Sequence, residues 1–428
     1  MKDLIKKIIV ENQQVQPVSG IQRIHQRIPL KSGMIITITG ARRSGKTHLL
    51  WQTINSINEQ GILPKQTIFL NFEDERLNLK ATDLDLILQS CYELYPEHNP
   101  ADFWFFFDEI QNIKGWEKFI RRIYDTISKN IYLTGSNSKM LASEIASELR
   151  GRAINFSLYP FSLREYLNFH HAPEKHITSA DRAKITTLTK SFIINGGFPE
   201  ISKAPPELRI RILQEYFNVM IYRDIVERYE ISNPETLKFF IKKALVSVTA
   251  PFSVNKTYND LRSMGYKVSN KYLYDFLEHS TAAFLLETVD KFHFSEIKRE
   301  KSDKKVYAID HGLLGAINYS HSQNLGTLLE NMVYLEFRKW GKSVYYFKDL
   351  QECDFMVEEN DTIIPVQVSW TIHDPLTRER EINGLLKACR YTGSKKGFII
   401  TFDETSHQEV NNISIRCIPV WEYFSNQV

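Results

Sequence analysis

The sequence predicts an α/β protein: a parallel sheet wrapped by helices comes first, a helical region follows, and a second α/β domain ends the chain. Three observations support this prediction. A β-branched run, 35–39, leads directly into a glycine-rich loop ending in Gly-Lys-Thr. A second apolar run, 103–107, ends in two adjacent carboxylates, Asp108 and Glu109. Strand-like runs then alternate with segments of helical periodicity, which is typical of parallel sheets.

The composition is that of a soluble protein with several domains. A chain of 428 residues with 43% hydrophobic content is long enough for two to four domains. The formal charge of +3 is too small to indicate a nucleic-acid partner by itself. Four widely separated cysteines without a C-x-x-C pair argue against a zinc site and a disulfide framework. Without a signal peptide or a bilayer-length apolar run, we expect a cytoplasmic protein with no membrane partner.

The loop at 40–47 has the pattern G-x-x-x-x-G-K-[ST] of a phosphate-binding loop. Gly40 and Gly45 permit backbone conformations closed to other residues, so successive N–H groups can surround phosphates. We expect Lys46 to reach the β- and γ-phosphates of ATP and Thr47 to ligate Mg²⁺, at the positive end of a helix beginning there. The alternative is a glycine-rich turn without a ligand. The expected cofactor-binding residues are Gly40, Ala41, Arg42, Arg43, Ser44, Gly45, Lys46, Thr47 and His48.

The carboxylates after the aromatic run supply the second part of a nucleotide site. A strand buried on both faces can place Asp108 beside the Mg²⁺ shell. Glu109, one residue later, is then positioned to activate a water for attack on the γ-phosphate. The alternative is an acidic surface turn. We expect Asp108 to be a metal ligand and Glu109 the general base.

A further strand, 131–135, ends in small polar residues. Ser136 and Asn137 are candidates for sensing the γ-phosphate or holding the attacking water, although either is equally suited to cap the next helix. The run 67–72 and the apolar periodicity after Ala81 add one more strand and helix to the same parallel sheet.

The order of these motifs resembles the AAA+ class of P-loop ATPases, and more narrowly a prokaryotic family that joins such a module to a C-terminal domain of unknown function. The matching segments are 40–47, 103–112, 133–136 and 149–166. In AAA+ relatives an arginine near the end of the module commonly reaches a phosphate in a neighbouring subunit. By resemblance Arg150 or Arg152 has that role, which implies a homo-oligomer; a surface basic pair beside a glycine turn is the alternative.

We expect four domains. They are an ATPase domain at 1–170, a helical lid or linker at 171–232, a winged helix-turn-helix at 233–310, and a C-terminal α/β domain at 311–428. The linker contains a turn-rich break at 195–200 and a long helical pattern at 208–229.

The winged-helix prediction rests on three helical patterns, 237–248, 254–264 and 269–278, followed by a small hairpin formed by 284–289 and 292–294. Ser269 is expected to cap the third helix. A DNA partner would meet two sets of residues. These are Asn270, Lys271, Tyr272 and Tyr274 on that helix, and the basic tract 298–305 with Lys298, Arg299, Lys301, Lys304 and Lys305. The alternative is a protein partner.

The last domain reads as a helix at 325–340, strands at 343–347, 353–357 and 363–369, a helix at 378–390, and strands at 396–402 and 413–420. This αβββαβ order resembles the restriction-endonuclease-like fold, whose metal site takes acids from the first helix, the second strand and an E-x-K on the third. Glu330 and Asp354 match the first two acids.

Gln367 and Ser369 stand where the resemblance places the third acid and the lysine. A Gln carbonyl can ligate Mg²⁺, but Ser cannot supply the ammonium that stabilises developing phosphorane charge. We therefore expect an inactive nuclease module unless Lys348 or a partner lysine enters the site.

The resulting functional prediction is a Mg²⁺-dependent ATP hydrolase whose nucleotide state repositions a DNA- or protein-binding C-terminal half. The alternatives are a nucleotide-gated regulatory scaffold with little turnover and an ATP-dependent DNA nuclease. ATP is favoured over GTP by the family resemblance and by the lack of an N-K-x-D pattern.

Overall fold

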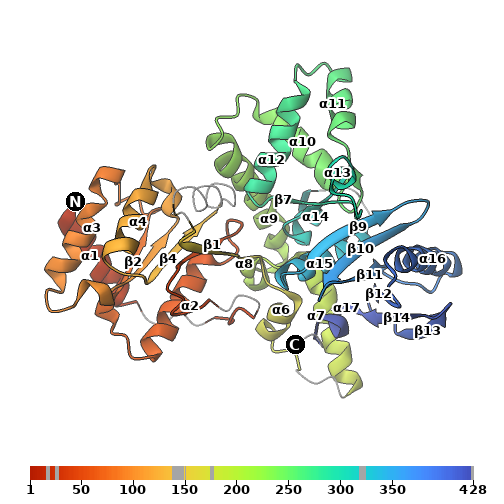
Figure 1. The fold of residues 1–428 in the computed structure, drawn as a ribbon, viewed down its shortest axis with the longest axis horizontal. Helices are drawn as coiled ribbons and strands as arrows, with labels where there is room; N and C mark the ends of the chain where they lie inside the picture. The colour runs from red at the N-terminus through yellow and green to blue at the C-terminus, as the bar shows by residue number, and fades with distance from the viewer. Residues whose placement is uncertain are drawn as a thin grey trace. The chain divides into compact units, whose positions relative to one another are not determined.

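The computed structural model describes residues 1–15, 20–24, 28–136, 149, 151–173, 178–317 and 324–425. Asn137 and Arg150 lie outside the described residues. The chain forms two compact units, Met1–Leu158 and Tyr159–Val428 (Figure 1), and each is described by itself.

Unit 1 is built on a parallel sheet, as predicted. Its strand order is β2-β3-β4-β1-β5, and every neighbouring pair is parallel. The strands are β1 (Ile35–Thr39), β2 (Thr67–Asn71), β3 (Trp104–Asp108), β4 (Ile131–Gly135) and β5 (Ala153–Ser157). The described helices are α1 (Lys2–Gln13), α2 (Lys46–Glu59), α3 (Asp85–Leu94) and α4 (Trp116–Thr126). Because the strands are parallel, the segments that follow β1, β3 and β4 meet at one edge of the sheet.

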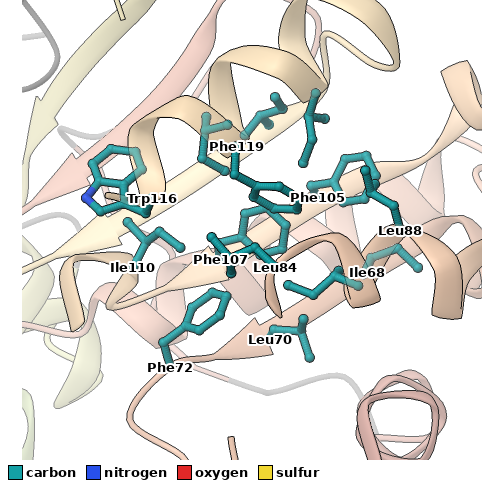
Figure 2. Packing of buried hydrophobic residues seen from close by; sticks show 14 of the residues in the cluster. Ile68, Leu70, Phe72, Leu84, Leu88, Phe105, Phe107, Ile110, Trp116 and Phe119 are labelled. Carbon is teal, nitrogen blue, oxygen red and sulfur yellow. The ribbon is translucent and has the colours of Figure 1, made fainter. Parts of the chain in front are cut away.

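The aromatic run in β3 is explained by burial on both faces of this sheet. Alternate strand residues point to opposite faces. Phe105 and Phe107 therefore pack on one face among residues such as Ile68, Leu70 and Trp116 (Figure 2), and Phe106 packs on the other face with Leu50 and Tyr132. Such strands are continuous apolar runs rather than alternating ones.

The first part of unit 2 is helical. It contains α6 (Leu163–Phe169), α7 (Ser179–Asn195), α8 (Pro199–Lys203) and α9 (Pro206–Ile221). The long helix predicted at 208–229 is α-helical only to Ile221 and continues as a π-helical segment, Tyr222–Glu227. Asp224 is buried in that segment.

The three predicted helices in the middle of the chain are confirmed as α10 (Pro234–Val246), α11 (Val254–Ser263) and α12 (Asn270–Ala282). The Ser269 hydroxyl caps α12 by accepting the N–H of Tyr272 at 3.2 Å. These helices pack with a small antiparallel sheet of order β6-β8-β7. Its strands are β6 (Pro251–Phe252), β7 (Leu286–Val289) and β8 (Lys304–Ala308), and α13 (Glu296–Glu300) lies between β7 and β8.

The predicted hairpin partner at 292–294 is wrong, because β7 pairs with β8 instead. The N–H of Phe292 donates to the carbonyl of Tyr346 at 2.7 Å. Its ring lies 5.7 Å from the ring of Tyr345. The apolar character of this segment thus serves packing against the C-terminal sheet rather than pairing with β7.

The C-terminal part of unit 2 has a mixed sheet of order β13-β14-β12-β11-β10-β9. Its strands are β9 (Ser343–Lys348), β10 (Glu352–Glu359), β11 (Thr362–Val368), β12 (Lys396–Thr401), β13 (Ser406–Val410) and β14 (Ile413–Pro419). Its helices are α14 (His311–Ile317), α15 (Leu325–Lys339), α16 (Pro375–Thr392) and α17 (Val420–Ser425). The predicted αβββαβ order is present as α15, β9, β10, β11, α16 and β12. Within the described ranges, no helix has the length and apolarity needed to cross a membrane.

The start of α14 contains two buried titratable groups with opposite behaviour. His311 is buried, its Nε2 lies 2.8 Å from the carbonyl oxygen of Phe192, and burial together with the charge of Lys339 lowers its pKa to about 3. Burial raises the pKa of the neighbouring Asp310 to about 6, although its carboxylate accepts the N–H groups of Gly197 and Gly312.

We expect His311→Gln to reduce the acid sensitivity of unit 2. An unfolded chain protonates this histidine below its ordinary pKa of 6.5, whereas the folded chain keeps it neutral down to about pH 3. The unfolded state therefore binds more protons as pH falls, and stability is lost by about 1.4 kcal/mol per pH unit. Asp310 acts in the opposite direction between about pH 6 and 4. Urea unfolding at pH 7 and pH 5 measures the free energy of unfolding. Between these two pH values the variant should lose roughly 2 kcal/mol less of it than the wild type does. An equal loss in the two proteins would contradict the role assigned to His311.

Candidate functional site

The glycine-rich loop has a backbone that its glycines make possible. Gly45 has φ 99°, in the left-handed region, and α2 begins at the next residue, Lys46, as predicted. A Cβ placed on Gly40 would lie 2.2 Å from the carbonyl oxygen of Leu158, so no larger residue fits there without moving the backbone. The loop therefore leads directly from β1 into the amino end of α2, where free N–H groups favour an anion.

Asp108 and Thr47 are brought together at the edge of the sheet although they are 61 residues apart. The Thr47 hydroxyl donates to one carboxylate oxygen of Asp108 at 2.6 Å, and the Thr134 hydroxyl donates to the other. Burial, reinforced by the nearby charge of Glu109, raises the pKa of Asp108 to about 6. A hydroxyl and a carboxylate are hard oxygen ligands of the kind Mg²⁺ prefers, so this pair fits that ion.

Lys46 and Glu109 form a buried ion pair beside these two residues. The Nζ of Lys46 lies 3.1 Å from a carboxylate oxygen of Glu109 and donates to the carbonyls of Gly40 and Ala41. Burial opposes ionisation of Glu109, but Lys46, the Gln111 amide and a more distant arginine outweigh it and lower its pKa. Glu109 is thus ionised at neutral pH, as a general base requires.

Glu109 is also fixed in place by its surroundings. Its backbone has φ 52°, in the left-handed region, and its N–H donates to the hydroxyl of Thr134 at 2.9 Å. The side-chain amide of Gln111 donates to its second carboxylate oxygen at 2.5 Å. The sequence analysis assigned no role to Gln111. Its position two residues after Glu109 is the feature of the sequence that could have indicated this contact.

Two buried hydroxyls at this edge have no hydrogen-bond partner among the described residues. They are Ser44 in the loop and Ser136 after β4. A buried unsatisfied hydroxyl costs about 1–3 kcal/mol, so such groups fit a site completed by a ligand. The guanidinium of Arg23 donates to the carbonyl of Ser44 at 3.0 Å. Nothing in the sequence singled out Arg23, because it lies outside the loop motif.

Three other predicted loop residues have these local contacts and conformations. Arg42 forms an ion pair with Glu73 at 2.8 Å, and Arg43 has φ 67°. His48 packs against Gly20, where an added Cβ would lie 2.1 Å from its Nε2.

Arg152 lies at the opposite edge of the sheet from the loop of its own chain. Its carbonyl accepts the N–H of Ile35, at the amino end of β1, whereas the loop follows the carboxyl end of that strand. Five strand residues separate the two ends by about 16 Å. The guanidinium of Arg152 instead contacts the carboxylate of Asp125 at 2.9 Å.

A second cluster of charges lies in unit 2, around Lys305. This side chain is fully buried, and its Nζ lies 2.7 Å from Glu352, 3.3 Å from Glu330 and 3.6 Å from Asp354. The hydroxyl of Tyr307 also donates to Glu330 at 2.9 Å. The prediction that Lys305 belongs to an exposed basic tract is therefore wrong, because the carboxylates of α15 and β10 draw its ammonium into the interior.

The other predicted residues of this region are engaged in local hydrogen bonds. The Gln367 amide accepts the N–H of Asp354 at 3.0 Å and donates to Glu381. The Ser369 hydroxyl donates to a backbone carbonyl. Lys348 is exposed and pairs with Glu352 at 2.9 Å. In the part of the chain that the structure describes, no group of three or more His, Cys, Asp or Glu side chains is arranged to hold a metal ion.

Three family models match the chain in succession. An AAA domain matches residues 32–167, a domain of unknown function (DUF8612) matches 186–324, and another (DUF4143) matches 325–423. The first match contains the loop, Asp108 and Glu109.

Two similar proteins extend over nearly the whole chain. The uncharacterized protein MJ1544 of Methanocaldococcus jannaschii is 32% identical over 446 residues, which cover 99% of this chain and 95% of that protein. An uncharacterized protein of Haemophilus influenzae is 29% identical over 408 residues, covering 94% and 98%. Among solved structures, the Aeropyrum pernix ORC1 protein in complex with DNA has 10% identity and a TM-score of 0.31, covering 74% of this chain and 90% of that one.

Proposed function

The chain belongs to the same family as MJ1544 of Methanocaldococcus jannaschii, and from that premise we propose that its first unit binds ATP with Mg²⁺ and hydrolyses it. The observation that carries the proposal is the meeting of Thr47 with Asp108, beside the buried pair of Lys46 and Glu109. These four residues lie together at one edge of the sheet, which supports a role for the loop in phosphate binding, for Thr47 and Asp108 in holding Mg²⁺, and for Glu109 as the base.

Each residue has a distinct part in the proposed reaction. The loop N–H groups and Lys46 bind the phosphates, and Lys46 exchanges its contacts to Gly40, Ala41 and Glu109 for phosphate oxygens. Thr47 and Asp108 hold Mg²⁺, which when bound neutralises phosphate charge. Glu109, released from Lys46, accepts the proton of the attacking water. Gln111 keeps the carboxylate of Glu109 in position.

Lys46→Ala tests nucleotide binding. We expect ATP affinity to fall about 100-fold, because one ammonium in a buried site makes charge-assisted hydrogen bonds to phosphate. Calorimetric titration of Mg-ATP into wild type, Lys46→Ala and the exposed control Lys65→Ala measures the effect. If the wild type bound no adenine nucleotide, or if Lys46→Ala bound ATP as tightly as Lys65→Ala, the proposal would be wrong.

We also propose that Arg152 acts on the nucleotide of a neighbouring subunit. Its position far from its own loop supports a role in trans, and the contact to Asp125 would be exchanged for a phosphate on assembly. Arg152→Ala should lower turnover at least about 10-fold, since arginines of this kind stabilise transition-state charge.

Mixing experiments distinguish the trans role from a structural one. Arg152→Ala retains Glu109, and Glu109→Gln retains Arg152, so an equal mixture should turn over ATP faster than either variant alone. Specific activity of the wild type should also rise with protein concentration. A flat specific activity, or a mixture no more active than its components, would contradict the role in trans.

We propose that unit 2 is a binding module composed of a helical linker (171–232), a winged helix (233–310) and an inactive restriction-endonuclease-like domain (311–428). Its support is the α15, β9, β10, β11, α16, β12 order and the exposure of Lys271 and Tyr274 on α12. Lys305 neutralises the acids that would otherwise attract a divalent cation, which disfavours the ATP-dependent nuclease.

A further inference from the structure

A pocket of about 450 Å³ lies in unit 2. It is formed by residues 291–293, the end of β9 with Asp349, and the last turns of α16. Its volume lies within the range of small-ligand sites, about 300–1,000 Å³. None of the residues proposed above for ATP chemistry belongs to it.

The rim of this pocket is positively charged. Four cations line it, namely Lys291, Lys348, Lys387 and Arg390, against one carboxylate, Asp349. Lys387 contacts Asp349 at 2.6 Å, and Lys348 is paired with Glu352 outside the pocket. The remaining excess of positive charge favours an anionic ligand.

Aromatic rings lie beside these cations. Phe347 is buried, and its ring lies 5.1 Å from that of Tyr391, which is partly exposed. Next to them Phe294 is 70% exposed, and its ring stacks on Tyr391 with centroids 5.4 Å apart and an interplanar angle of 27°. A phenylalanine this exposed buries little apolar surface of its own, so the ring face that does not stack on Tyr391 is available to a planar ligand.

We propose that this pocket binds one nucleotide of a single-stranded nucleic acid. Lys291 and Arg390, which line the pocket, contact the phosphate, and the base stacks on the open face of Phe294, the neighbour that extends the ring of Tyr391. Cations that follow the backbone and aromatic faces that stack on bases are the two features such sites combine. In a duplex the base faces are covered by their neighbours, and an acidic peptide would leave the aromatic faces unused. The proposal deepens the binding role of unit 2 and rests on it, but it does not depend on ATP.

Fluorescence anisotropy with a labelled 20-nucleotide oligo(dT) and the full chain, without ATP, tests the proposal. We expect Arg390→Glu to weaken binding at least 10-fold and Phe294→Ala about 5- to 10-fold. Arg390→Lys should retain most of the affinity, and affinity should fall with added salt. Phe294→Ala should have no effect on an abasic strand, which has phosphates but no bases. Lys65→Glu, at an exposed position of unit 1, is the charge-reversal control and should bind as wild type.

Three results would overturn the proposal. Wild-type affinity in both Arg390→Glu and Phe294→Ala would remove the pocket from binding. If Lys271→Glu lost binding while Arg390→Glu and Phe294→Ala kept it, single-stranded nucleic acid would bind to α12 and not to the pocket. If abasic strands bound as tightly as oligo(dT), and poly-glutamate competed as well as oligo(dT) does, the pocket would be a site for acidic peptides. ATP turnover of the same variants should equal that of the wild type, so failure of the pocket and failure of the ATPase assignment are measured separately.

Discussion

Glu109→Gln is expected to lower ATP turnover by about 10²- to 10⁴-fold while leaving Mg-ATP bound. The amide cannot accept a proton from the attacking water, but it preserves the volume of the side chain. It also removes the negative charge that holds Lys46 at 3.1 Å, so affinity for ATP should stay equal or rise.

Single-turnover hydrolysis and calorimetry on the same protein separate the two effects. Glu117→Gln, the same change at a partly exposed position of α4, is the control and should behave as wild type. Gln111→Ala should reduce turnover less than Glu109→Gln, because Glu109 remains present but is less fixed. If Glu109→Gln hydrolysed ATP at the wild-type rate, another residue would be the general base. If even the wild type hydrolysed ATP barely detectably, the alternative of a nucleotide-gated scaffold would be favoured.

Lys305→Met is expected to destabilise unit 2 by about 3–5 kcal/mol, the usual result of removing one partner from a buried ion cluster. Burial opposes the charge of Lys305, but Glu330, Asp354 and Glu352 outweigh it and raise its pKa. Lys305 is the fully buried cation that contacts these three carboxylates among the described residues. Without its ammonium the carboxylates must take up protons or move apart.

Urea unfolding followed by tryptophan fluorescence measures the loss. Lys304→Met is the matched control, since Lys304 is the adjacent residue in β8, is partly exposed and pairs with Asp290. Its cost should stay below about 1 kcal/mol. Adding Glu330→Gln to Lys305→Met should recover part of the stability. Equal stability of the two methionine variants would show that the buried ammonium is dispensable.

Patterns local in sequence were sufficient for much of the fold. The β1 run, the loop and the start of α2 follow one another within 35–47, and their chemistry could be read directly. The αβββαβ order was also predictable, because each element carries its own apolar periodicity. β13 was missed since its residues, Ser406–Val410, are mostly polar and its pairing with β14 gives no local signal.

Features that depend on distant contacts could not be predicted. Lys305 sits in a lysine-rich stretch that looks solvated, and only the carboxylates of α15 and β10 reveal its role. The second strand of the wing was placed at 292–294 because apolar residues occur there, although that segment packs on β9. By contrast, the meeting of Thr47 and Asp108 was predictable, because the carboxyl ends of parallel strands share an edge.

The Lys305 cluster also limits how this polypeptide can be dissected. Ala308 and Asn331 exchange two hydrogen bonds, of 2.8 and 3.0 Å, next to the ammonium shared by α15 and β10. A fragment ending after β8 would leave a lysine without its acids, and one beginning after it would leave the acids without their lysine. Truncations intended for separate expression should therefore keep β8 and α15 in the same fragment. Chimaeras made from two relatives should take both elements from the same parent.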